Sequence, residues 1–474
     1  MNSSFAKQTG KGDLHLKLLN TKDDPFGLFC KLYQFHERLF ILESLVGPRK
    51  LTEFSIVGFD PDLVVSCDSF KLYVRNSKNK IVRTEDLIDP LAQLRRFVPK
   101  VKNNRFRYVG GAVGFISYDA IRYWERISSK HRVKNYPLLE FGIYTDGILY
   151  DHQKNNAHYF TTGKSRFDEI KDEVEAANPV QLKNFSCSSP TTALSRKEYV
   201  NMVKKAKRYI YDGDIFQVVL SKNTNFTVNG DLLPVYGNLR ELNPSPYMYF
   251  LKLGDMAIIG SSPEMLVRVT AKHVETFPIA GTRPVVKNEI KNNILAKELL
   301  ADEKEVAEHT MLVDLARNDL GRVCKYGTVK VPELMSIKRF SHVQHIVSHV
   351  EGYLAPKFTS YDALKAVFPA GTVSGAPKVR AMEIIDELEP HERGLYAGAI
   401  GYFSANGSCD FAITIRSLIV KGHKASIQSG AGIVIDSVPE KEWKESEDKA
   451  HGVILSLKEA SKGLRRGRNL SVYS

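Results

Sequence analysis

Two Glu-x-x-Glu pairs, far apart in the chain, constrain its fold more than any other feature. Glu305 and Glu308 lie in one segment with the residue pattern of a helix, and Glu442 and Glu445 lie in another. Residues three positions apart share one helix face, with Cβ atoms about 5–6 Å apart. If the helices converge, four carboxylates face one another, which a hard cation that prefers oxygen ligands, such as Mg²⁺, would stabilise. The pattern predicts a fold that brings two distant helices to one metal site.

Each pair also has a simpler explanation. Glu305 follows Asp302 by three residues, the spacing of a capping box, and the second pair lies near a helix N-terminus, where the helix dipole stabilises carboxylates. A third pair, Glu389 and Glu392, encloses a proline and is predicted to lie in a turn. The spacing alone therefore does not identify a metal site.

The composition is typical of a globular protein from a reducing compartment. Hydrophobic residues make up 43% and charged residues 26% of the 474 positions, which is ordinary. No apolar run reaches the roughly 18 residues needed to span a bilayer, and no apolar signal region is visible near the N-terminus. The five cysteines include no Cys-x-x-Cys pair, so neither a disulfide framework nor a zinc site is expected. We predict a cytoplasmic protein with no membrane partner.

The net charge of +13 indicates an affinity for anions. One interpretation is a basic nucleic-acid-binding protein, and the other is a basic surface that favours a small anionic substrate. Lysines and arginines are spread along the chain, with one short cluster from Lys462 to Arg468, and no nucleic-acid-binding motif occurs. We therefore expect no nucleic-acid partner and keep that function as a remote alternative.

A loop-rich connection divides the chain. Asn178 with Pro179 and the segment 186–192 are typical of loops, and Ser195 with Glu198 forms a capping box that begins a helix. These signals predict an N-terminal region, a connection, a second domain and a basic tail, at residues 1–176, 177–194, 195–461 and 462–474.

Strand and helix patterns are mixed without a regular βαβ rhythm. Residues 54–59 and 215–220 have the apolar patterns of strands, and residues 302–318 and 441–460 have those of helices. A further helix is expected to start at Pro377, because proline is favoured at the first helical position. We predict an α+β protein, a layered α/β sandwich with largely antiparallel sheets.

Two small-residue turns and one arginine are candidate anion sites. The loop 368–378 runs into a helix, whose free N–H groups bind anions, and Thr372 adds a hydroxyl group. The turn 428–433 presents further backbone N–H groups. Arg416 ends an apolar strand, a position suited to bidentate carboxylate binding. A capped loop is the simpler alternative for the first turn.

Nine segments are more informative as an ordered set than any one of them alone. The first five are Ile215–Val219, Asn243–Met248, Ser261–Glu264, Pro278–Arg283 and Lys304–His309. The next four are Met311–Asp319, Gln344–Ser348, Gly371–Lys378 and Gly430–Ile433, after which the second glutamate pair follows. In this order they closely resemble the chorismate-utilising enzymes, and within them the large subunit of anthranilate synthase. Residues 1–176 match more loosely, through Leu42–Ser44 and Gly110–Asp119.

The resemblance implies the chorismate-binding enzyme fold and a Mg²⁺-dependent reaction. Chorismate would be aminated at C2 with loss of its C4 hydroxyl group, and pyruvate would then be eliminated to give anthranilate, the first committed step of tryptophan biosynthesis. Mg²⁺ on Glu305, Glu308, Glu442 and Glu445 would hold the ring carboxylate and act as a Lewis acid. Chorismate is a dianion, which agrees with two candidate anion sites.

The resemblance also implies roles for individual residues. Glu264 is expected to protonate the departing hydroxyl group, which requires a pKa raised by burial or by neighbouring carboxylates. His345, which on its own is more typical of a structural histidine in a strand, is expected to assist the elimination. The residues expected to bind chorismate are Gly281, Thr282, Thr372, Tyr396, Arg416, Gly430, Ala431 and Gly432.

Two positions separate the branches of the family. Relatives that add water carry a lysine at the position of Gln217; glutamine cannot serve as that base, which favours ammonia as the nucleophile. Many aminodeoxychorismate synthases carry a lysine at the position of Ala280. These residues favour anthranilate as the product, with the large subunit of aminodeoxychorismate synthase as the alternative.

The resemblance implies two further partners. No Gly-x-Cys-x-Gly segment surrounds any cysteine, so a separate glutamine amidotransferase subunit is expected to supply ammonia. Residues 1–176 would sense tryptophan as a feedback inhibitor, and a hydrogen bond between domains is the structural alternative. The residues expected to bind tryptophan are Glu43, Ser44, Asn243, Pro244, Ser245, Tyr247 and Met248.

Overall fold

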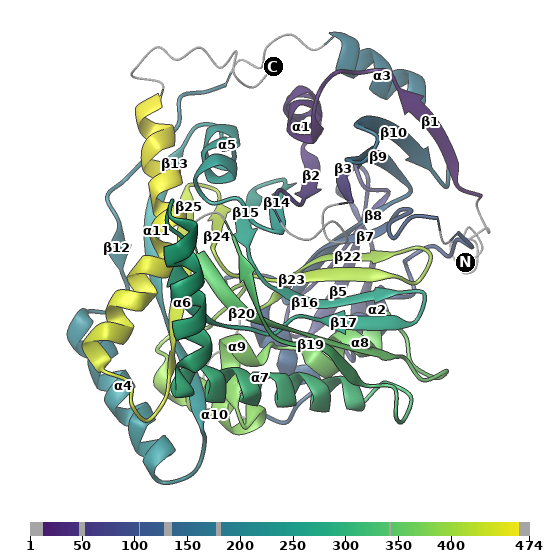
Figure 1. The fold of residues 1–474 in the computed structure, drawn as a ribbon. Helices are drawn as coiled ribbons and strands as arrows, with labels where there is room; N and C mark the ends of the chain where they lie inside the picture. Colours follow the sequence, from purple (N-terminus) through teal and green to yellow (C-terminus); the bar gives the residue numbers. More distant parts are fainter. Residues whose placement is uncertain are drawn as a thin grey trace.

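Two large antiparallel sheets form the centre of the molecule (Figure 1). A computed structural model describes residues 13–46, 53–103, 105–127, 135–176, 182–340 and 343–463. Within these ranges every pair of strands is antiparallel. The predicted α+β sandwich with largely antiparallel sheets is confirmed.

The first sheet has 13 strands in the described part of the chain. Its strands follow one another in the order β1 (His15–Leu19), β10 (Asn156–Thr161), β9 (Asp146–Asp151), β3 (Phe54–Phe59), β2 (Arg38–Glu43), β14 (Tyr247–Leu253), β15 (Met256–Ser262), β24 (Ser417–Lys421), β25 (Lys424–Ile433), β13 (Gln217–Asn229) and β11 (Ser186–Cys187). Beside this path, β13 also pairs with β12 (Thr191–Thr192) and β21 (Gly375–Ala376).

The second sheet has 12 strands among the same residues. Its order is β18 (Ile279–Pro284), β20 (Val343–Tyr353), β17 (His273–Thr276), β16 (Met265–Thr270), β23 (Cys409–Ile413), β22 (Ala399–Ser404), β7 (Gly111–Ile116), β8 (Leu139–Tyr144), β4 (Leu63–Cys67), β5 (Lys71–Asn76) and β6 (Ile81–Asp86). The long strand β19 (Lys330–Arg339) pairs with β20.

Large side chains fill the space between the two sheets. Phe40 and Tyr249 from the first sheet pack in one cluster with Phe115, Tyr144 and Tyr402 from the second, and all five are buried. Burial of a large apolar side chain contributes roughly 1.5–3 kcal/mol. This shared core fixes the sheets face to face.

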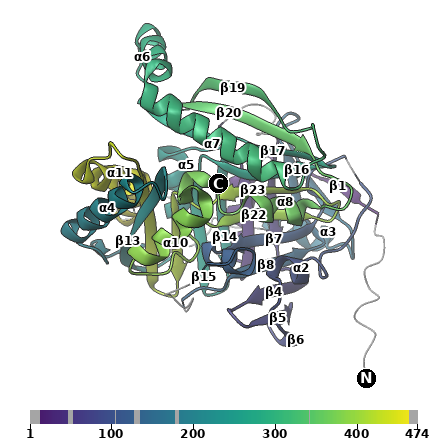
Figure 2. The same cartoon turned by 90° about the horizontal axis from the view of Figure 1, so that it is seen from below.

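Helices cover the outer faces of both sheets. α1 (Pro25–Tyr33), α5 (Leu233–Leu242) and α11 (Pro439–Gly463) pack on the first sheet, and α7 (Glu303–Gly321) and α8 (Ser360–Val367) pack on the second. Figure 2 shows α6 and α7 along one side of the molecule and α4 with α11 along another. The other helices are α2 (Pro90–Leu94), the 3-10 helix Tyr118–Tyr123, α3 (Phe167–Ala176), α4 (Arg196–Tyr211), α6 (Glu289–Ala301), α9 (Gly371–Ser374) and α10 (Lys378–Leu388). No helix in the described ranges is long and apolar enough to cross a bilayer.

The helix signals of the sequence agree closely with the structure. Ser195 and Glu198 form the expected reciprocal capping box at the start of α4. At α7 the Asp302 side chain accepts a hydrogen bond from the Glu305 backbone N–H. Pro377 lies one position earlier than expected, as the N-cap of α10, and α11 extends beyond the predicted range at both ends.

Strands from the N-terminal and C-terminal regions share both sheets. β2 pairs with β14 in the first sheet, and β7 pairs with β22 in the second. The predicted connection supplies β11 and β12, both paired with β13. The boundary at residues 177–194 therefore does not separate the sheets. Residues 177–181 of the connection and 464–474 of the basic tail lie outside the described residues.

Candidate active site

At the candidate active site, helix α7 contacts one strand of each sheet, β13 and β18. Gln217 of β13 donates a hydrogen bond from Nε2 to Glu308 Oε1, at 2.8 Å. One helical turn away, Glu305 Oε2 lies 3.1 Å from the point that a Cβ atom would occupy at Gly281 of β18. The first glutamate pair thus faces β13 of the first sheet and β18 of the second.

Glu264 lies between β15 and β16 and is buried. Burial raises the pKa of its carboxyl to about 8, while Thr372 and Lys449 act in the opposite direction. A carboxyl with this pKa is mostly protonated at pH 7 and can donate a proton. Glu264 and Thr372 line the same small cavity, so the expected acid and one expected substrate ligand are neighbours.

His345 of β20 has its Nδ1 atom 2.7 Å from the Gly281 carbonyl oxygen and 3.1 Å from the Thr282 hydroxyl group. Because a carbonyl oxygen only accepts hydrogen bonds, Nδ1 carries the proton in the neutral ring. Burial lowers the pKa of His345, and Arg416 and Lys449 lower it further. The imidazole is therefore neutral at pH 7, with Nε2 available to accept a proton.

Arg416 is a half-buried cation between β23 and β24, without an ion-pair partner among the described side chains. Burial lowers the pKa of its guanidinium, and its backbone adopts a left-handed φ of 53°. Tyr396 and Glu445 act on this pKa in the opposite direction. Strained backbone and a desolvated charge without an ion-pair partner both cost free energy and are typical of binding sites. An anionic ligand would remove the electrostatic part of that cost.

The turn predicted at 428–433 is wrong, because this segment forms the end of β25 and pairs with β13. Two of its glycines leave room for side chains of the site. A Cβ atom at Gly430 would lie 2.9 Å from the Tyr396 hydroxyl oxygen, and one at Gly432 would lie 2.6 Å from Gln217 Nε2. Burial raises the pKa of Tyr396 to about 12, so its phenol remains a hydrogen-bond donor. Ala431 packs in a hydrophobic cluster with residues of α4 and α10.

The second glutamate pair lies on α11, near its N-terminus. Glu442 is buried, and its pKa is raised by burial and by Glu445. Glu445 forms an ion pair with Lys449, at 2.7 Å. In the first pair, the pKa of Glu308 is likewise raised by burial and by its neighbour Glu305.

Two lysines connect the glutamate pairs electrostatically. Lys304 and Lys449 each lower the pKa of Glu308 on α7 and of Glu442 on α11. Each lysine is therefore in electrostatic range of both helices. That the two pairs form one metal site stays a prediction.

Lys449 is a site residue that the sequence analysis missed. Its charge also lowers the pKa of Glu264 and of His345, so it lies within electrostatic range of the proposed acid and the proposed base. The available signal was its position four residues after Glu445, which places both on one face of α11. Its ammonium group adds to the positive potential that an anionic ligand would meet.

The carboxylates do not form a closed metal cluster. No group of three or more His, Cys, Asp or Glu side chains in the described ranges is arranged to hold a metal ion by itself. The third Glu-x-x-Glu pair lies after α10, as expected for a turn: Glu389 bonds to Arg393, and Glu392 accepts hydrogen bonds from Asn135. That pair has the spacing but not the surroundings of the other two.

A second cavity lies where β2 and β14 pair, and it holds four of the seven residues expected to bind tryptophan. These four are Glu43, Ser44, Tyr247 and Met248. The other three, Asn243, Pro244 and Ser245, lie in the loop that joins α5 to β14. The cavity volume is about 70 Å³, well below the roughly 300–1,000 Å³ of typical ligand pockets. A ligand the size of tryptophan would have to displace side chains to enter.

Some polar groups in this cavity have hydrogen-bond partners and others do not. Glu43 accepts hydrogen bonds from Tyr236 and Arg240, whereas the buried Ser44 hydroxyl group has no partner among the described residues. Arg107, which the sequence analysis missed, also lines the cavity, and its buried Nε–H has no partner there either. An isolated arginine beside a strand carries no sequence signal that would have identified it.

The comparisons with known proteins agree with this geometry. The family model of the chorismate binding enzyme matches residues 52–454. Anthranilate synthase component 1 of Methanothermobacter thermautotrophicus is 48% identical over 440 residues, which are 93% of each chain. Aminodeoxychorismate synthase component 1 of Bacillus subtilis is 40% identical, over 92% of this chain and 95% of its own.

A solved structure has the same fold. Anthranilate synthase component I from Streptococcus pneumoniae superposes with a TM-score of 0.76 at 35% identity, over 92% of this chain and 98% of its own. The matched length and the identity exceed what a shared fold alone requires. The chain therefore belongs to the chorismate binding enzyme family.

Proposed function

We propose that this chain converts chorismate and ammonia to anthranilate and pyruvate, the first step committed to tryptophan. Three side chains of the site support this conclusion together. They are a protonated carboxyl at Glu264, a neutral imidazole at His345, and a cation without an ion-pair partner at Arg416. The identity with anthranilate synthase component 1 over nearly the whole chain supports the same activity.

The anion-binding groups would orient the substrate dianion. Arg416 would bind one carboxylate of chorismate in a bidentate manner, with the Tyr396 phenol and the backbone at Gly430 beside it. The Thr372 hydroxyl group, which shares a cavity with Glu264, would hold the substrate near the acid. Desolvation of Arg416 strengthens this interaction, because charges attract more strongly in a low dielectric.

The proton transfers follow from the two perturbed side chains. Protonated Glu264 donates its proton to the C4 hydroxyl group, which leaves as water while ammonia bonds to C2. The C2 proton is then removed as the C3–O bond to the enolpyruvyl group breaks, which leaves the ring aromatic. The group leaves as the enolate of pyruvate and takes up one proton at its methylene carbon to become pyruvate. His345 would accept that proton at Nε2, since its Nδ1–H is held by Gly281.

The glutamates fit Mg²⁺ by their chemistry. All four are hard oxygen donors, and burial raises the pKa of Glu308 and Glu442, so a bound cation would favour the ionised form of both. Glu305, Glu308, Glu442 and Glu445 would hold the ion together with water and a substrate carboxylate. When bound, Mg²⁺ would neutralise the charge of that substrate carboxylate and fix its orientation.

The nucleophile is assigned from Gln217. Its amide donates to Glu308 and has no basic group that would activate water, whereas ammonia is nucleophilic without a base. The ammonia would come from a glutamine amidotransferase subunit, a partner that the component 1 designation of the relatives implies.

The product assay tests the activity directly. We expect the chain, with chorismate, Mg²⁺ and ammonium at alkaline pH, to form anthranilate, detected by its fluorescence, and pyruvate in equal amount. Formation of 4-amino-4-deoxychorismate without anthranilate would instead assign the aminodeoxychorismate synthase activity, the function of the Bacillus subtilis relative. No product of either kind would reject the proposal.

We expect tryptophan to inhibit this reaction through the cavity between β2 and β14. The unpaired Ser44 hydroxyl group would accept a hydrogen bond from the amino group of tryptophan, because the Glu43 carboxylate is already engaged. Loss of a buried hydrogen bond costs about 1–3 kcal/mol, so Ser44→Ala should raise the inhibitory concentration of tryptophan about tenfold. The variant should keep its kcat for anthranilate. Unchanged inhibition would remove Ser44 from the tryptophan site.

A further inference from the structure

Lys222 of β13 is a buried lysine that the proposed reaction does not use. Its side chain is 2% exposed, although a lysine usually keeps its ammonium group in water. Burial lowers the pKa of Lys222 to about 8, Glu447 opposes that shift and Lys444 adds to it. The ammonium group is therefore mostly charged at pH 7, and a buried charge needs a compensating contact.

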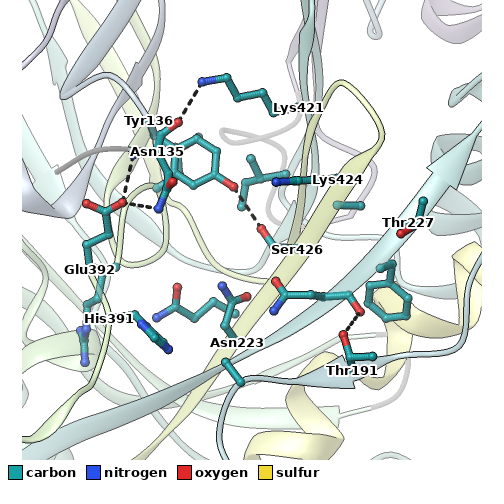
Figure 3. Close-up of a pocket in the computed structure, with 18 of the residues that line it drawn as sticks. Asn135, Tyr136, Thr191, Asn223, Thr227, His391, Glu392, Lys421, Lys424 and Ser426 are labelled. Carbon is teal, nitrogen blue, oxygen red and sulfur yellow. Dashed lines mark hydrogen bonds between the residues drawn. The ribbon is translucent and has the colours of Figure 1, made fainter.

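The two faces of β13 have different surroundings. On one face, Asn223 and Thr227 line a large polar hollow (Figure 3). Lys222 precedes Asn223, and because successive side chains of a strand alternate, it points to the opposite face. That face is covered by α4 and by the first part of α11, which lies beside β13 and β25 in Figure 1.

The compensating contact is the indole ring of Trp443 on α11. Lys222 Nζ lies 3.0 Å from the centre of this ring. Tryptophan attracts cations more strongly than the other aromatic side chains do, and the attraction grows when both groups are desolvated. The ion pair with Glu447 is long, at 3.8 Å, and the Glu447 side chain is 45% exposed, so solvent screens it. The ring therefore holds the ammonium group more firmly than the carboxylate does.

Lys222 and Ser429 hold α11 from two neighbouring strands. They lie directly opposite each other on β13 and β25, so their side chains share one face of the sheet. Lys222 contacts Trp443, and the Ser429 hydroxyl group donates a hydrogen bond of 2.7 Å to the backbone carbonyl of Ser446, one helical turn further along α11. Trp443 also packs edge-on against Tyr199 of α4. These contacts fix which face of α11 is turned to the sheet.

The predicted metal ligands lie on the adjacent face of the same two turns. Glu442 and Glu445 each come one position before a residue of the sheet-facing set, and one position is about 100° around an α-helix. Because side chains end about 5–6 Å from the helix axis, a rotation of about 20° moves their ends by about 2 Å. Site residues need to be held within about 0.5 Å of the productive geometry. The rotation of α11 therefore decides whether both carboxylates reach a metal ion.

We propose that Lys222 is a positioning residue for the metal site: its ammonium group, held over Trp443, sets the rotation of α11 and thereby places Glu442 and Glu445 for Mg²⁺. This inference rests on the metal site of the proposed function. Lys222 acts through α11, because its contacts are with Trp443 and Glu447 of that helix.

The first experiment removes the charge of Lys222 and measures the affinity for Mg²⁺. Lys222→Met keeps an unbranched side chain of similar length, so α11 should stay packed on the sheet. At pH 7, the Mg²⁺ concentration that gives half of the rise in unfolding temperature should increase about tenfold, the loss expected for a desolvated cation–π contact. kcat at saturating Mg²⁺ should fall by no more than about threefold, because the carboxylates still hold the ion once it is bound.

Three further variants are matched to this one. Lys222→Arg keeps a cation over the ring and should bring the Mg²⁺ response back to within about threefold of the unaltered chain. Lys204→Met removes an exposed lysine of α4 and should leave the response unchanged. Trp443→Leu removes the ring instead, so adding Lys222→Met to it should weaken Mg²⁺ binding little further. Trp443→Leu takes the place of Lys222→Met if the latter does not fold, as judged by circular dichroism.

Fluorescence tests the contact without turnover. The chain has two tryptophans, so Trp124→Phe leaves Trp443 as the only one. In that background, Lys222→Met should change the emission of Trp443 at pH 7, because a charge beside the indole ring is lost, whereas Lys204→Met should not.

The outcomes separate positioning from packing. If Lys222→Met lowered the unfolding temperature equally at every Mg²⁺ concentration, without a change in the half-shift concentration, Lys222 would only pack and the inference would be overturned. Unchanged Trp443 emission, or no Mg²⁺-dependent shift in the unaltered chain, would also overturn it. If the unaltered chain showed the Mg²⁺-dependent shift but formed no anthranilate, the proposed reaction would fail while the role of Lys222 at the metal site stood.

Discussion

Replacing Glu264 with glutamine should reduce kcat for anthranilate formation by about 10²–10⁴-fold, the usual contribution of general acid catalysis. The amide keeps the size of the carboxyl and cannot donate its proton in the same way. Because Glu264 is buried and neutral at pH 7, the substitution leaves no unpaired charge behind. The dissociation constant of chorismate, measured by calorimetry with Mg²⁺ present, should change little.

The pH dependence provides a second readout of the same residue. Burial raises the pKa of Glu264 to about 8, and the protonated form is the active one. In the unaltered chain kcat should therefore fall as pH rises through about 8, and this limb of the profile should be missing in Glu264→Gln. Glu459→Gln, which changes a half-buried carboxylate paired with Lys462 on α11, is the control and should retain both rate and profile. Full activity in Glu264→Gln would contradict the acid role.

Local features of the fold were predictable from the sequence because neighbouring residues determine them. The capping box at Ser195 depends on atoms three residues apart, and it begins α4 as expected. The absence of a βαβ rhythm was sufficient to predict antiparallel sheets. The pairing of β2 with β14 was not predictable by these rules, because it joins segments about 200 positions apart and no local pattern encodes such a contact.

The candidate site, like the fold, was only partly predictable from the sequence. The order of motifs identified Glu264, His345 and the glutamate pairs, but their chemistry depends on burial, which only the tertiary structure supplies. The raised pKa of Glu264 and the lowered pKa of Arg416 are consequences of desolvation. Lys449 and Arg107 were missed because each is a single basic residue in a chain that has many.

Replacing Glu308 with alanine should abolish activity together with the Mg²⁺ requirement. Residues that only support a metal ligand already cost 10–100-fold when removed, so loss of a ligand should cost at least about 100-fold. Two effects coincide at this position, since Glu308 also accepts the hydrogen bond that holds Gln217. The residual rate should no longer respond to added Mg²⁺, and the rise in unfolding temperature that Mg²⁺ gives the unaltered chain should disappear.

The thermal shift separates a metal ligand from a residue that only positions Gln217. Glu308→Gln keeps a hydrogen-bond acceptor for Gln217 but is a much weaker ligand, so it should also lose the Mg²⁺-dependent shift. Glu303→Ala removes an exposed carboxylate from the first turn of the same helix and should keep the shift and the rate. If Glu308→Ala retained the Mg²⁺-dependent shift while losing activity, the carboxylate would act on Gln217 alone. The metal would then have to be held by Glu305 and the α11 pair.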